Sequence, residues 1–401
     1  MDNDVIVVGA GSAGCFSAFH AAKLGVQVII CEEHSEVGVP SHCTGHVSRD
    51  GLKRFNLSLP ENVLENEIDS VIFYSPSGYT LKVRFSYPVT YVINRERFDQ
   101  HLCNMAQKKG VEVLNHAHVD SLIFKDQMTR GVVIKEKNET RKLTSRVVID
   151  AEGVSSTLLK RAGLPSLNYQ LVANGVQAEV DKIDNIQNST VEVFLGRDFT
   201  SGFFAWIVPH QDGKAKVGLG TTQNNPKDCL RNFIRHHPIA RRRLKFRDVK
   251  SLVYHPISLG GPISRTFYDG LLIVGDAASQ VKPTTGGGLI MGLTCAKIAG
   301  EVAASAIHRE NSTAAFLSEY EQLWRRRIGF EMMVMKHIRI MLNRLSDKQL
   351  DRLVALSTRL ELSKTLNSVA DIDFQGTSLV QLIKNPKFLL TTLYFLIASF
   401  L

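Results

Sequence analysis

Cysteine is scarce in this sequence, and the cysteines that it has are far apart. They lie at positions 15, 31, 43, 103, 229 and 295, and no CxxC pair occurs among them. A zinc ribbon or a cysteine-ligated iron–sulfur cluster needs closely spaced ligands, so we expect no metal site. Isolated thiols are also typical of proteins that work in a reducing cytoplasm.

Long apolar runs are also missing. No apolar stretch reaches the ~18 to 20 residues that a membrane-spanning helix needs. The nearest is the uncharged tail 388–401, which follows Lys384 and Lys387. A helix of that length would measure roughly 21 Å and could not cross ~30 Å of hydrocarbon. The tail is expected either to enter one leaflet or to pack on the core, and we favour membrane contact.

Because an apolar strand and a glycine-rich motif stand near the first residue, we expect no secretory leader, and no internal repeat is found. Its composition, 44% hydrophobic and 22% charged, excludes disordered and collagen-like proteins, and 401 residues predict two to three domains. Lys and Arg outnumber Asp and Glu by 48 to 39, which favours anionic partners. The basic runs 241–247 and 325–327 indicate a solvated face or a contact with anionic headgroups. We expect no nucleic-acid partner, because no aromatic platform or helix-turn-helix pattern accompanies them.

The N-terminal segment predicts a strand, a tight turn, a helix and a second strand in close succession. The apolar run 5–8 is typical of a buried strand, and the sequence GxGxxG follows at 9–14. A helix is predicted over 15–24 and a second strand over 26–30, which ends beside Glu32. This order, with an acid about 20 residues after the last glycine, is the dinucleotide-binding fingerprint.

Each residue of this motif has a physical role. Gly9 permits the tight turn, Gly11 lets the backbone approach a pyrophosphate, and Gly14 lets the helix pack closely on the strand. The free N–H groups at the helix start favour an anion, and Glu32 can accept hydrogen bonds from the adenosine ribose. The motif does not separate FAD from NAD, and a plain glycine turn is the alternative interpretation.

A second motif begins with another apolar run, at 271–274. It continues as Gly-Asp-Ala-Ala, which contains Asp276, and as Pro-Thr-Thr-Gly-Gly-Gly-Leu at 283–289, before a helix-forming run. An acid at a strand end and a glycine-rich helix start suit a phosphate-bearing or ribityl-bearing ligand, with Asp276 bonded to a hydroxyl group. An unrelated strand–helix junction is the alternative. The N–H groups expected to face an electron-rich ring edge are those near Gly287, Gly288 and Leu289.

Together the two motifs resemble the flavoprotein superfamily of aromatic hydroxylases and prenyl reductases. That resemblance implies FAD bound in an extended form, with its isoalloxazine ring at the second motif. A middle motif at 147–156, VVIDAEGVSS, is also similar, although Glu152 stands where the superfamily usually has Asp. The contacts of the shorter acid, including any to a nicotinamide cofactor, are therefore not carried over.

Two further stretches resemble the geranylgeranyl reductase family. The segment 38–45, GVPSHCTG, is similar to the family's PxxCxG segment. The segment 201–209, SGFFAWIVP, is similar to its aromatic-x-Trp-x-Phe-Pro segment, with Val208 in place of the Phe. The resemblance covers about residues 4–345 and is strongest with archaeal enzymes that saturate the isoprenoid chains of ether lipids.

Motif and resemblance together predict the cofactor-binding residues. Val119 would act through its backbone, and Arg95 is otherwise a solvated residue paired with Arg97 at a helix start. The predicted set is Gly9, Gly11, Ala13, Gly14, Glu32, Cys43, Thr44, Gly45, Arg95, Val119, Asp276, Gly287, Gly288 and Leu289.

Cys43 is the predicted catalytic residue, a thiol near the flavin that positions the alkene or helps to deliver a proton. The alternative is a core thiol. The predicted substrate-binding residues are Phe204, Trp206 and Pro209. Alternation along a strand puts Phe204 and Trp206 on one face, where they form either part of the core or a wall for an apolar chain.

We predict an α/β protein with a discontinuous Rossmann-type FAD-binding domain, an antiparallel β-sheet substrate domain and a helical C-terminal region. The FAD-binding domain is predicted over 1–65, 94–165 and 264–310, the substrate domain over 66–93 and 166–263, and the helical region over 311–401.

The resemblance implies an FAD-dependent reductase that saturates geranylgeranyl double bonds of membrane ether lipids or prenyl diphosphates by hydride transfer from reduced flavin. The electron donor is left open between reduced ferredoxin and NAD(P)H. Besides the isoprenoid lipid, the expected partner is the inner face of the cell membrane, where a cytoplasmic protein would bind peripherally. The alternatives are an FAD-dependent monooxygenase of an aromatic or lipid substrate and a non-enzymatic flavin electron-transfer protein.

Overall fold

The computed structural model describes residues 3–400 except 137, 138, 182, 184, 211, 212, 246–248, 250 and 368–370. Arg247 of the first basic run and Leu401 at the end of the tail lie outside the described residues. The chain divides into two compact units. Unit 1 comprises Met1–Ser41, Arg95–Tyr169 and Gly260–Met333, and unit 2 comprises His42–Asn94, Gln170–Leu259 and Val334–Leu401.

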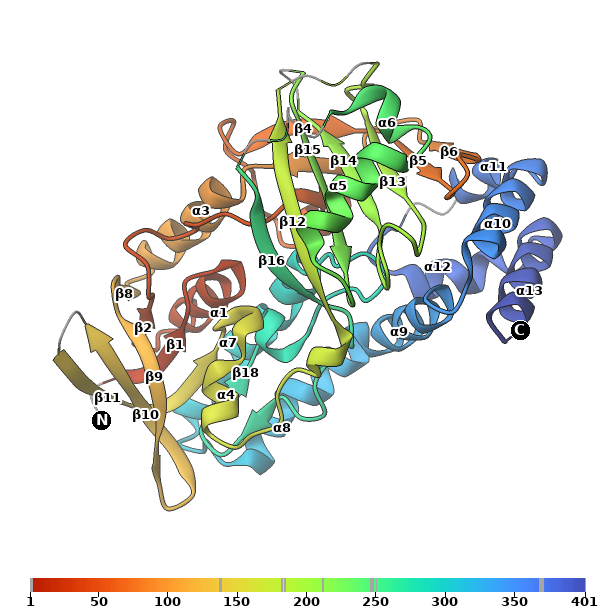
Figure 1. The fold of residues 1–401 in the computed structure, drawn as a ribbon. Helices are drawn as coiled ribbons and strands as arrows, with labels where there is room; N and C mark the ends of the chain where they lie inside the picture. Colours follow the sequence, from red (N-terminus) through yellow and green to blue (C-terminus); the bar gives the residue numbers. More distant parts are fainter. Residues whose placement is uncertain are drawn as a thin grey trace. The chain divides into compact units, whose positions relative to one another are not determined.

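Unit 1 is built around a largely parallel sheet in the order β17-β18-β11-β1-β2-β8, and β10 extends it by pairing with β11 and β9 (Figure 1). Its strands are β1 (Asn3–Val8), β2 (Val28–Cys31), β8 (Glu112–Leu114), β9 (His118–Lys125), β10 (Met128–Glu136), β11 (Glu139–Asp150), β17 (Phe267–Tyr268) and β18 (Leu271–Ile273). Its helices are α1 (Ser12–Lys23), α3 (Arg95–Gln107), α4 (Thr157–Arg161), α7 (Leu289–His308) and α8 (Ala314–Trp324), and the 3-10 turn η4 spans Gly275–Ala278.

The core of unit 1 follows from the apolar strands that the sequence shows. Val5, Ile6 and Val7 of β1 are fully buried, and β1 lies between β2 and β11 in parallel register. Helix α1 packs so tightly on α7 that a Cβ on Gly300 would overlap the carbonyl oxygen of Ser17. Only glycine therefore fits at this position of α7.

Unit 2 contains a seven-stranded sheet in the order β16-β12-β15-β14-β13-β5-β6 and a three-stranded sheet in the order β3-β7-β4. Its strands are β3 (His46–Ser48), β4 (Leu64–Ile68), β5 (Ser70–Tyr74), β6 (Thr80–Arg84), β7 (Thr90–Ile93), β12 (Val172–Val180), β13 (Thr190–Phe194), β14 (Ala205–Pro209), β15 (Ala215–Thr221) and β16 (Val253–Ser258). Its helices are α2 (Arg49–Lys53), α5 (Pro226–His236), α6 (Ala240–Arg243), α10 (Asp347–Arg359), α11 (Leu362–Asn367), α12 (Gln375–Leu382) and α13 (Pro386–Phe400), and α9 (Phe330–Leu342) runs from unit 1 into unit 2.

Helix α5 covers one face of the large sheet of unit 2 (Figure 1). Its buried residues Leu230, Phe233 and Ile234 recur at helical spacing and join the apolar core of that sheet. Every pair of neighbouring strands in the sheet is antiparallel except β13 and β5, which are parallel. The predicted fold class is confirmed, with this one parallel pair as a departure.

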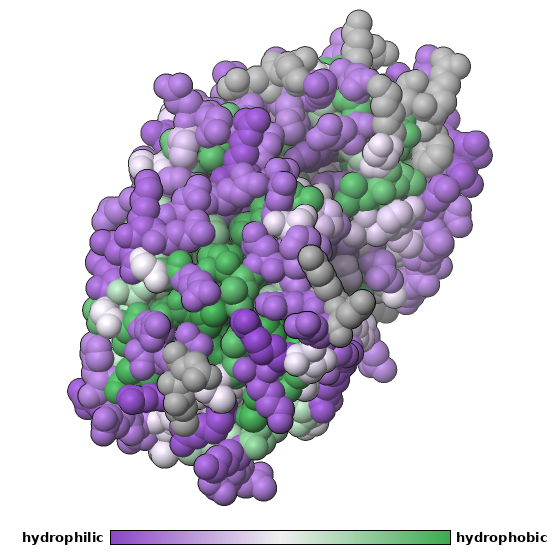
Figure 2. All heavy atoms as spheres, turned by 90° about the vertical axis from the view of Figure 1, so that its left-hand side faces the viewer, coloured by the Kyte–Doolittle hydropathy of each residue, from purple (hydrophilic) through white to green (hydrophobic). Residues whose placement is uncertain are grey.

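Figure 2 shows one face of the molecule. Hydrophilic residues predominate on this face, and hydrophobic residues are grouped between them.

The first basic run is only partly exposed. Arg241 and Arg242 are exposed, but Arg243 donates to both carboxylate oxygens of the buried Glu192, at 2.6 and 2.9 Å. The solvated-face interpretation is therefore wrong for Arg243, which neutralises a buried carboxylate.

Candidate functional site: two glycine-rich turns and a thiol-bearing loop

The first predicted motif forms a tight turn between β1 and α1. Gly9 has a φ of +90°, which favours glycine, and a Cβ there would lie 2.7 Å from the carbonyl oxygen of Ala151. A Cβ on Gly14 would overlap the carbonyl oxygen of Gly9, so the helix start touches the strand end. A Cβ on Gly11 would meet no atom of the described residues within 4 Å. The turn therefore leaves room directly in front of Gly11.

Helix α1 presents its N-terminus at this turn. Its N-cap is Gly11, and among the described residues no side chain caps it. The first N–H groups of a helix have no partner within the helix, and the helix dipole adds a partial positive charge there. Together with the space at Gly11, this arrangement suits a phosphate-bearing ligand.

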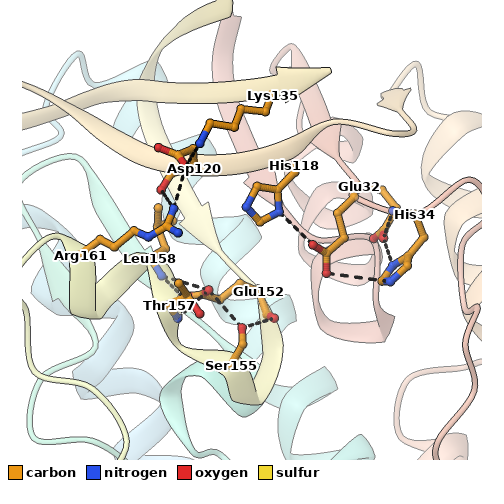
Figure 3. Close-up of polar contacts among 11 residues, drawn as sticks. Glu32, His34, His118, Asp120, Lys135, Glu152, Ser155, Thr157, Leu158 and Arg161 are labelled. Carbon is orange, nitrogen blue, oxygen red and sulfur yellow. Dashed lines mark hydrogen bonds and ion pairs between the residues drawn. The ribbon is translucent and has the colours of Figure 1, made fainter. Parts of the chain in front are cut away.

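Glu32 is buried at the end of β2 and is held against the turn. Its Oε2 accepts a hydrogen bond from the Ala10 N–H at 2.8 Å. Its Oε1 accepts from the His34 N–H at 3.0 Å and lies 2.7 Å from Nδ1 of the same histidine (Figure 3). The sequence analysis did not predict a role for His34. Its position two residues after Glu32 was the available signal.

Strand β9 brings Val119 close to the same acid. The backbone of Glu32 bonds to Leu114 and Ala117, each at 2.8 Å, and Val119 lies half-buried two residues further along. His118 contacts Glu33 through Nδ1 and Oε2 at 2.9 Å. Val119 therefore stands near the carboxyl end of β2, as Glu32 does.

Arg95 reaches the start of α1 from the start of α3. Its Nη2 donates to both carboxylate oxygens of Asp99 at 3.2 Å and to Ser12 Oγ at 3.3 Å. Burial raises the pKa of Asp99, and Arg95 opposes that rise. Arg97 is exposed, so the interpretation of both arginines as a solvated pair is wrong for Arg95, whose side chain is only 18% exposed.

The second predicted motif lies against the first. Gly275 has a φ of +68°, and a Cβ built on it would lie 2.9 Å from Ala13 Cβ. Asp276 follows, and its Oδ1 would lie 2.9 Å from a Cβ on Gly288. Burial raises the pKa of the Asp276 carboxyl, and the charge of Arg95 lowers it in part. Two segments more than 250 residues apart in the sequence thus form one surface.

Helix α7 begins at this surface, and a lysine that the sequence did not single out lies beside its first residues. Its N-cap Gly288 has no side-chain cap among the described residues. A Cβ on Gly287 would lie 2.8 Å from Cε and 3.4 Å from Nζ of Lys282. The sequence could have indicated this lysine, because Lys282 immediately precedes the proline of the second motif.

The side chain of Glu152, in the middle motif, bonds to backbone N–H groups that follow it in the chain. Its carboxylate accepts from the Thr157 N–H at 2.8 Å, from the Leu158 N–H at 2.9 Å and from Ser155 Oγ at 3.2 Å (Figure 3). It therefore stabilises the start of α4. Asp150 is fully buried, and burial together with the charge of Glu152 raises its pKa well above the usual range.

In unit 2, Cys43 lies in a loop that is pressed against β7. Gly45 has a φ of +81°, a Cβ there would overlap the carbonyl oxygen of Ile93, and the Ile93 N–H donates to Gly45 O at 2.9 Å. The Gly45 N–H lies 3.4 Å from Cys43 Sγ. Cys43 and Thr44 are half-buried, whereas the other five cysteines are buried. Cys43 is thus the one thiol of the chain with substantial exposure.

Trp206 is linked to the Cys43 loop through Gln177. A Cβ on Gly218 would lie 2.6 Å from Trp206 Cζ2 and 2.7 Å from Gln177 Cβ, so both side chains cover that glycine. The Gln177 Nε2 donates to the carbonyl oxygen of His42 at 3.2 Å. Gln177 is therefore a neighbour both of His42, which precedes Cys43, and of Trp206, which belongs to the predicted aromatic wall.

Of the three predicted substrate-binding residues, the structure brings two together. Phe204 and Trp206 are half-buried, with ring centroids 6.0 Å apart. Pro209 is buried at the end of β14, three positions after Trp206, so alternation places it on the opposite strand face. Its carbonyl oxygen accepts from Asn66 Nδ2 at 2.9 Å. Grouping Pro209 with the two aromatic residues is therefore not supported by the geometry.

No group of three or more His, Cys, Asp or Glu residues that could hold a metal ion occurs in the part of the chain that the structure describes. The expectation that no stretch is long and apolar enough to span a membrane is wrong by length and mean hydropathy for one described helix, α7, but 72% of the apolar window of α7 is buried inside the protein.

The glycine turns, the uncapped helices and the acids at strand ends define a dinucleotide-binding α/β protein. A family model described as lycopene cyclase protein matches residues 4–360. Digeranylgeranylglycerophospholipid reductase 2 of Methanothermobacter thermautotrophicus is 34% identical over 96% of this chain and 97% of its own length. The enzyme of the same name from Methanopyrus kandleri is also 34% identical, over 82% of this chain and 84% of its own length.

Solved structures share this fold. A geranylgeranyl bacteriochlorophyll reductase-like protein from Thermoplasma acidophilum has a TM-score of 0.85 and 26% identity, covering 95% of this chain and 98% of its own. The halogenase PltM, solved in complex with FAD, shares the fold with a TM-score of 0.70 at 15% identity, covering 95% of this chain and 85% of its own. The chain belongs to the geranylgeranyl reductase family, within the wider group that the lycopene cyclase model describes.

Proposed function

We propose that this protein is an FAD-dependent reductase that saturates geranylgeranyl double bonds of ether lipids or prenyl diphosphates. The observation that carries the proposal is the near full-length similarity to digeranylgeranylglycerophospholipid reductases, at 34% identity over 96% of the chain. It coincides with two glycine-rich turns that meet at Ala13 and Gly275 and that suit a long dinucleotide.

The residues of unit 1 fit FAD. The space at Gly11 and the uncapped start of α1 suit the pyrophosphate, and the fixed carboxylate of Glu32 suits the adenosine ribose. Asp276, a buried carboxyl group with a raised pKa, suits a hydroxyl group of the ribityl chain. The N–H groups of Gly288 and Leu289 at the start of α7 would hold the ring edge, whereas the Gly287 N–H donates to Thr285 Oγ1 at 3.3 Å. When bound and reduced, FAD supplies the hydride for the alkene.

Cys43 is proposed to hold and deliver the proton that completes the reduction. The Sγ–H bond breaks, the proton adds to the second alkene carbon, and water restores the thiol. Its partial exposure supports this role, because a thiol buried like the other five could not meet a substrate. Phe204 and Trp206 would line the path of the apolar chain and keep water away from it. Accurate placement must supply much of the rate, since isolated alkenes accept hydride poorly.

Helix α13 supports a membrane-surface location. One side of it packs on α10: Ala398 is buried, Tyr394 Oη donates to Gln349 O at 3.3 Å, and Gln349 Nε2 donates to Ala398 O at 3.0 Å. The other side carries exposed apolar residues at helical spacing, beside Lys384 and Lys387, and such a surface suits an anionic bilayer. These residues are Leu389, Leu390, Leu393, Leu396 and Ile397.

We further propose a cytoplasmic protein that is peripheral on the inner face of the cell membrane, with reduced ferredoxin or NAD(P)H as the electron donor. The experiment that tests the reaction type is conversion of a geranylgeranyl lipid in the absence of oxygen. A reductase saturates the chain without oxygen. A monooxygenase of the same fold would give no product until oxygen is added, and that result would overturn the proposal.

A further inference from the structure

The loop between η4 and α7 holds a lysine over the glycines that begin α7. The Lys282 N–H donates to Gly287 O at 3.2 Å, and Lys282 O accepts from the Gly286 N–H at 2.8 Å. These two bonds close a turn that lays the side chain of Lys282 across Gly287, where a Cβ would lie 2.8 Å from Cε and 3.4 Å from Nζ. The lysine is half-buried, so its ammonium group is confined near the helix start.

A buried chain of hydrogen bonds fixes the base of this loop. The Gly275 N–H donates to Gln280 Oε1 at 2.8 Å, and Gln280 Nε2 donates to Tyr320 Oη at 2.8 Å. Tyr320 Oη in turn donates to Ile273 O at 2.9 Å. Gln280 and Tyr320 are fully buried, and a satisfied buried network of this kind rigidifies its surroundings. The core therefore holds Gln280, which lies two residues before Lys282.

Two sources of positive potential converge at this turn. Helix α7 is 20 residues long and has no side-chain cap at Gly288 among the described residues, so its dipole is directed at the loop. Lys282 adds a full charge at the same end. Asp276 is the acid of the motif, and Arg95 supplies an opposite charge to it.

We propose that Lys282 raises the reduction potential of the bound flavin by placing a positive charge beside the ring edge that becomes negative on reduction. The proposal rests on the proposed function, in which FAD binds with its ring at the second motif. Uptake of two electrons and one proton converts neutral oxidised flavin into an anion whose charge lies on the N1–C2=O edge. A nearby cation stabilises the anion and leaves the oxidised form almost unaffected. The electrons come from the donor of the reaction.

The test is the midpoint potential of the bound flavin, measured anaerobically against a reference dye. For Lys282→Met we expect at least a tenfold lower ratio of reduced to oxidised flavin at a given applied potential, which is about 30 mV for a two-electron couple. Lys282→Arg should keep the wild-type potential, because it keeps the charge. Lys297→Met removes the same charge from an exposed position on α7 and should also leave the potential unchanged.

The binding constant for FAD is measured on the same variants and separates the two claims. An unchanged potential in Lys282→Met with FAD bound would refute the role of Lys282 and leave the proposed function intact. An equal drop in Lys282→Met and Lys297→Met would also refute it, because the effect would then be general electrostatics. Failure of the wild-type protein to bind FAD would overturn the proposed function and this proposal together.

Discussion

Gly275 and Ala13 stand so close that a Cβ on the glycine would lie 2.9 Å from the Cβ of the alanine. This contact joins the start of α1 to the turn after β18, so the two halves of the predicted cofactor site depend on each other. Gly275 also has a φ of +68°, which side-chain-bearing residues adopt at a cost.

Replacing Gly275 should damage folding and FAD binding together. In Gly275→Ala, the left-handed backbone costs roughly 1–2 kcal/mol and overpacking against Ala13 adds about 1–3 kcal/mol. Gly110→Ala is the matched control, because Gly110 has a φ of +89° and a Cβ there would meet no described atom within 4 Å. Denaturant unfolding of both variants checks the difference. Equal destabilisation would show that the contact with Ala13 contributes nothing.

Asp276 should reduce stability in the absence of FAD and favour binding of the cofactor. Loss of a hydrogen bond from a ligand hydroxyl to a carboxylate costs about 1.5–3 kcal/mol, so Asp276→Asn should weaken FAD binding roughly 10- to 150-fold. Cys43→Ala should change it little.

The apo form of Asp276→Asn should be more stable than the wild type at neutral pH. Burial raises the pKa of Asp276, so its contribution to stability is present below the unfolded value of 3.8 and is lost as the pH rises through the folded value. Unfolding curves of the two apo proteins should therefore converge toward pH 3.8 and diverge above it. A difference that does not vary with pH would contradict this assignment.

Cys43→Ala should retain FAD, because the two glycine-rich turns of unit 1 are intact. It should reduce geranylgeranyl lipids slowly, because a proton donor is lost. General acid catalysis commonly contributes 10²- to 10⁴-fold, which sets the expected loss in rate. Rapid-mixing measurement of flavin reoxidation checks it, with Cys43→Ser as the variant that keeps a weaker donor. A rate equal to that of the wild type would make Cys43 a structural residue.

His237 should make unit 2 sensitive to acid. It is fully buried, and its ring packs against the rings of Tyr74, Phe194, Phe199 and Phe233. Burial lowers the pKa of His237 from 6.5 to about 4, and a contact with Ser75 O opposes the shift.

The unfolded chain therefore takes up this proton first as the pH falls. Stability should drop between pH 6.5 and pH 4, by about 3 kcal/mol from this group. Measurement of unfolding free energy against pH should show a shallower decline for His237→Gln. Curves that remain parallel would show that another group causes the acid sensitivity.

The exposed side of α13 should control binding to anionic vesicles. A variant with Leu390→Ser, Leu393→Ser and Ile397→Ser removes exposed apolar surface and should lower the bound fraction in vesicle flotation several-fold. Its fold and FAD content should not change, because these side chains face away from α10. Tyr394→Phe, on the packed side, serves as the control and should bind as the wild type does. Undiminished binding of the triple variant would exclude α13 as the membrane contact.

Local patterns made unit 1 largely predictable from the sequence. The run Val5–Val8, the glycines after it and Glu32 follow rules of spacing that depend only on neighbouring residues, so the strand, turn and acid were placed correctly. Helix α1 begins at Ser12, three residues before the predicted start, because the glycine-rich sequence hid the first helical turn.

Contacts between distant segments were not predictable in this way. Arg243 and Glu192 are 51 residues apart, so nothing in the basic run indicated that one of its members is buried. Lys282 and His34 take their positions from backbone turns whose shape the sequence alone did not give. Pro209 was grouped with Trp206 by family pattern, although simple alternation already places it on the other face of β14.

Single-turnover reduction of a geranylgeranyl lipid tests the central claim most directly. The protein, loaded with FAD and reduced without oxygen, is mixed with the lipid in vesicles, and flavin reoxidation is followed beside the mass of the product. We predict that one double bond is saturated, with a gain of two hydrogens, for each flavin reoxidised. Flavin that stays reduced with the lipid present, or reoxidises only when oxygen is admitted, would contradict the account.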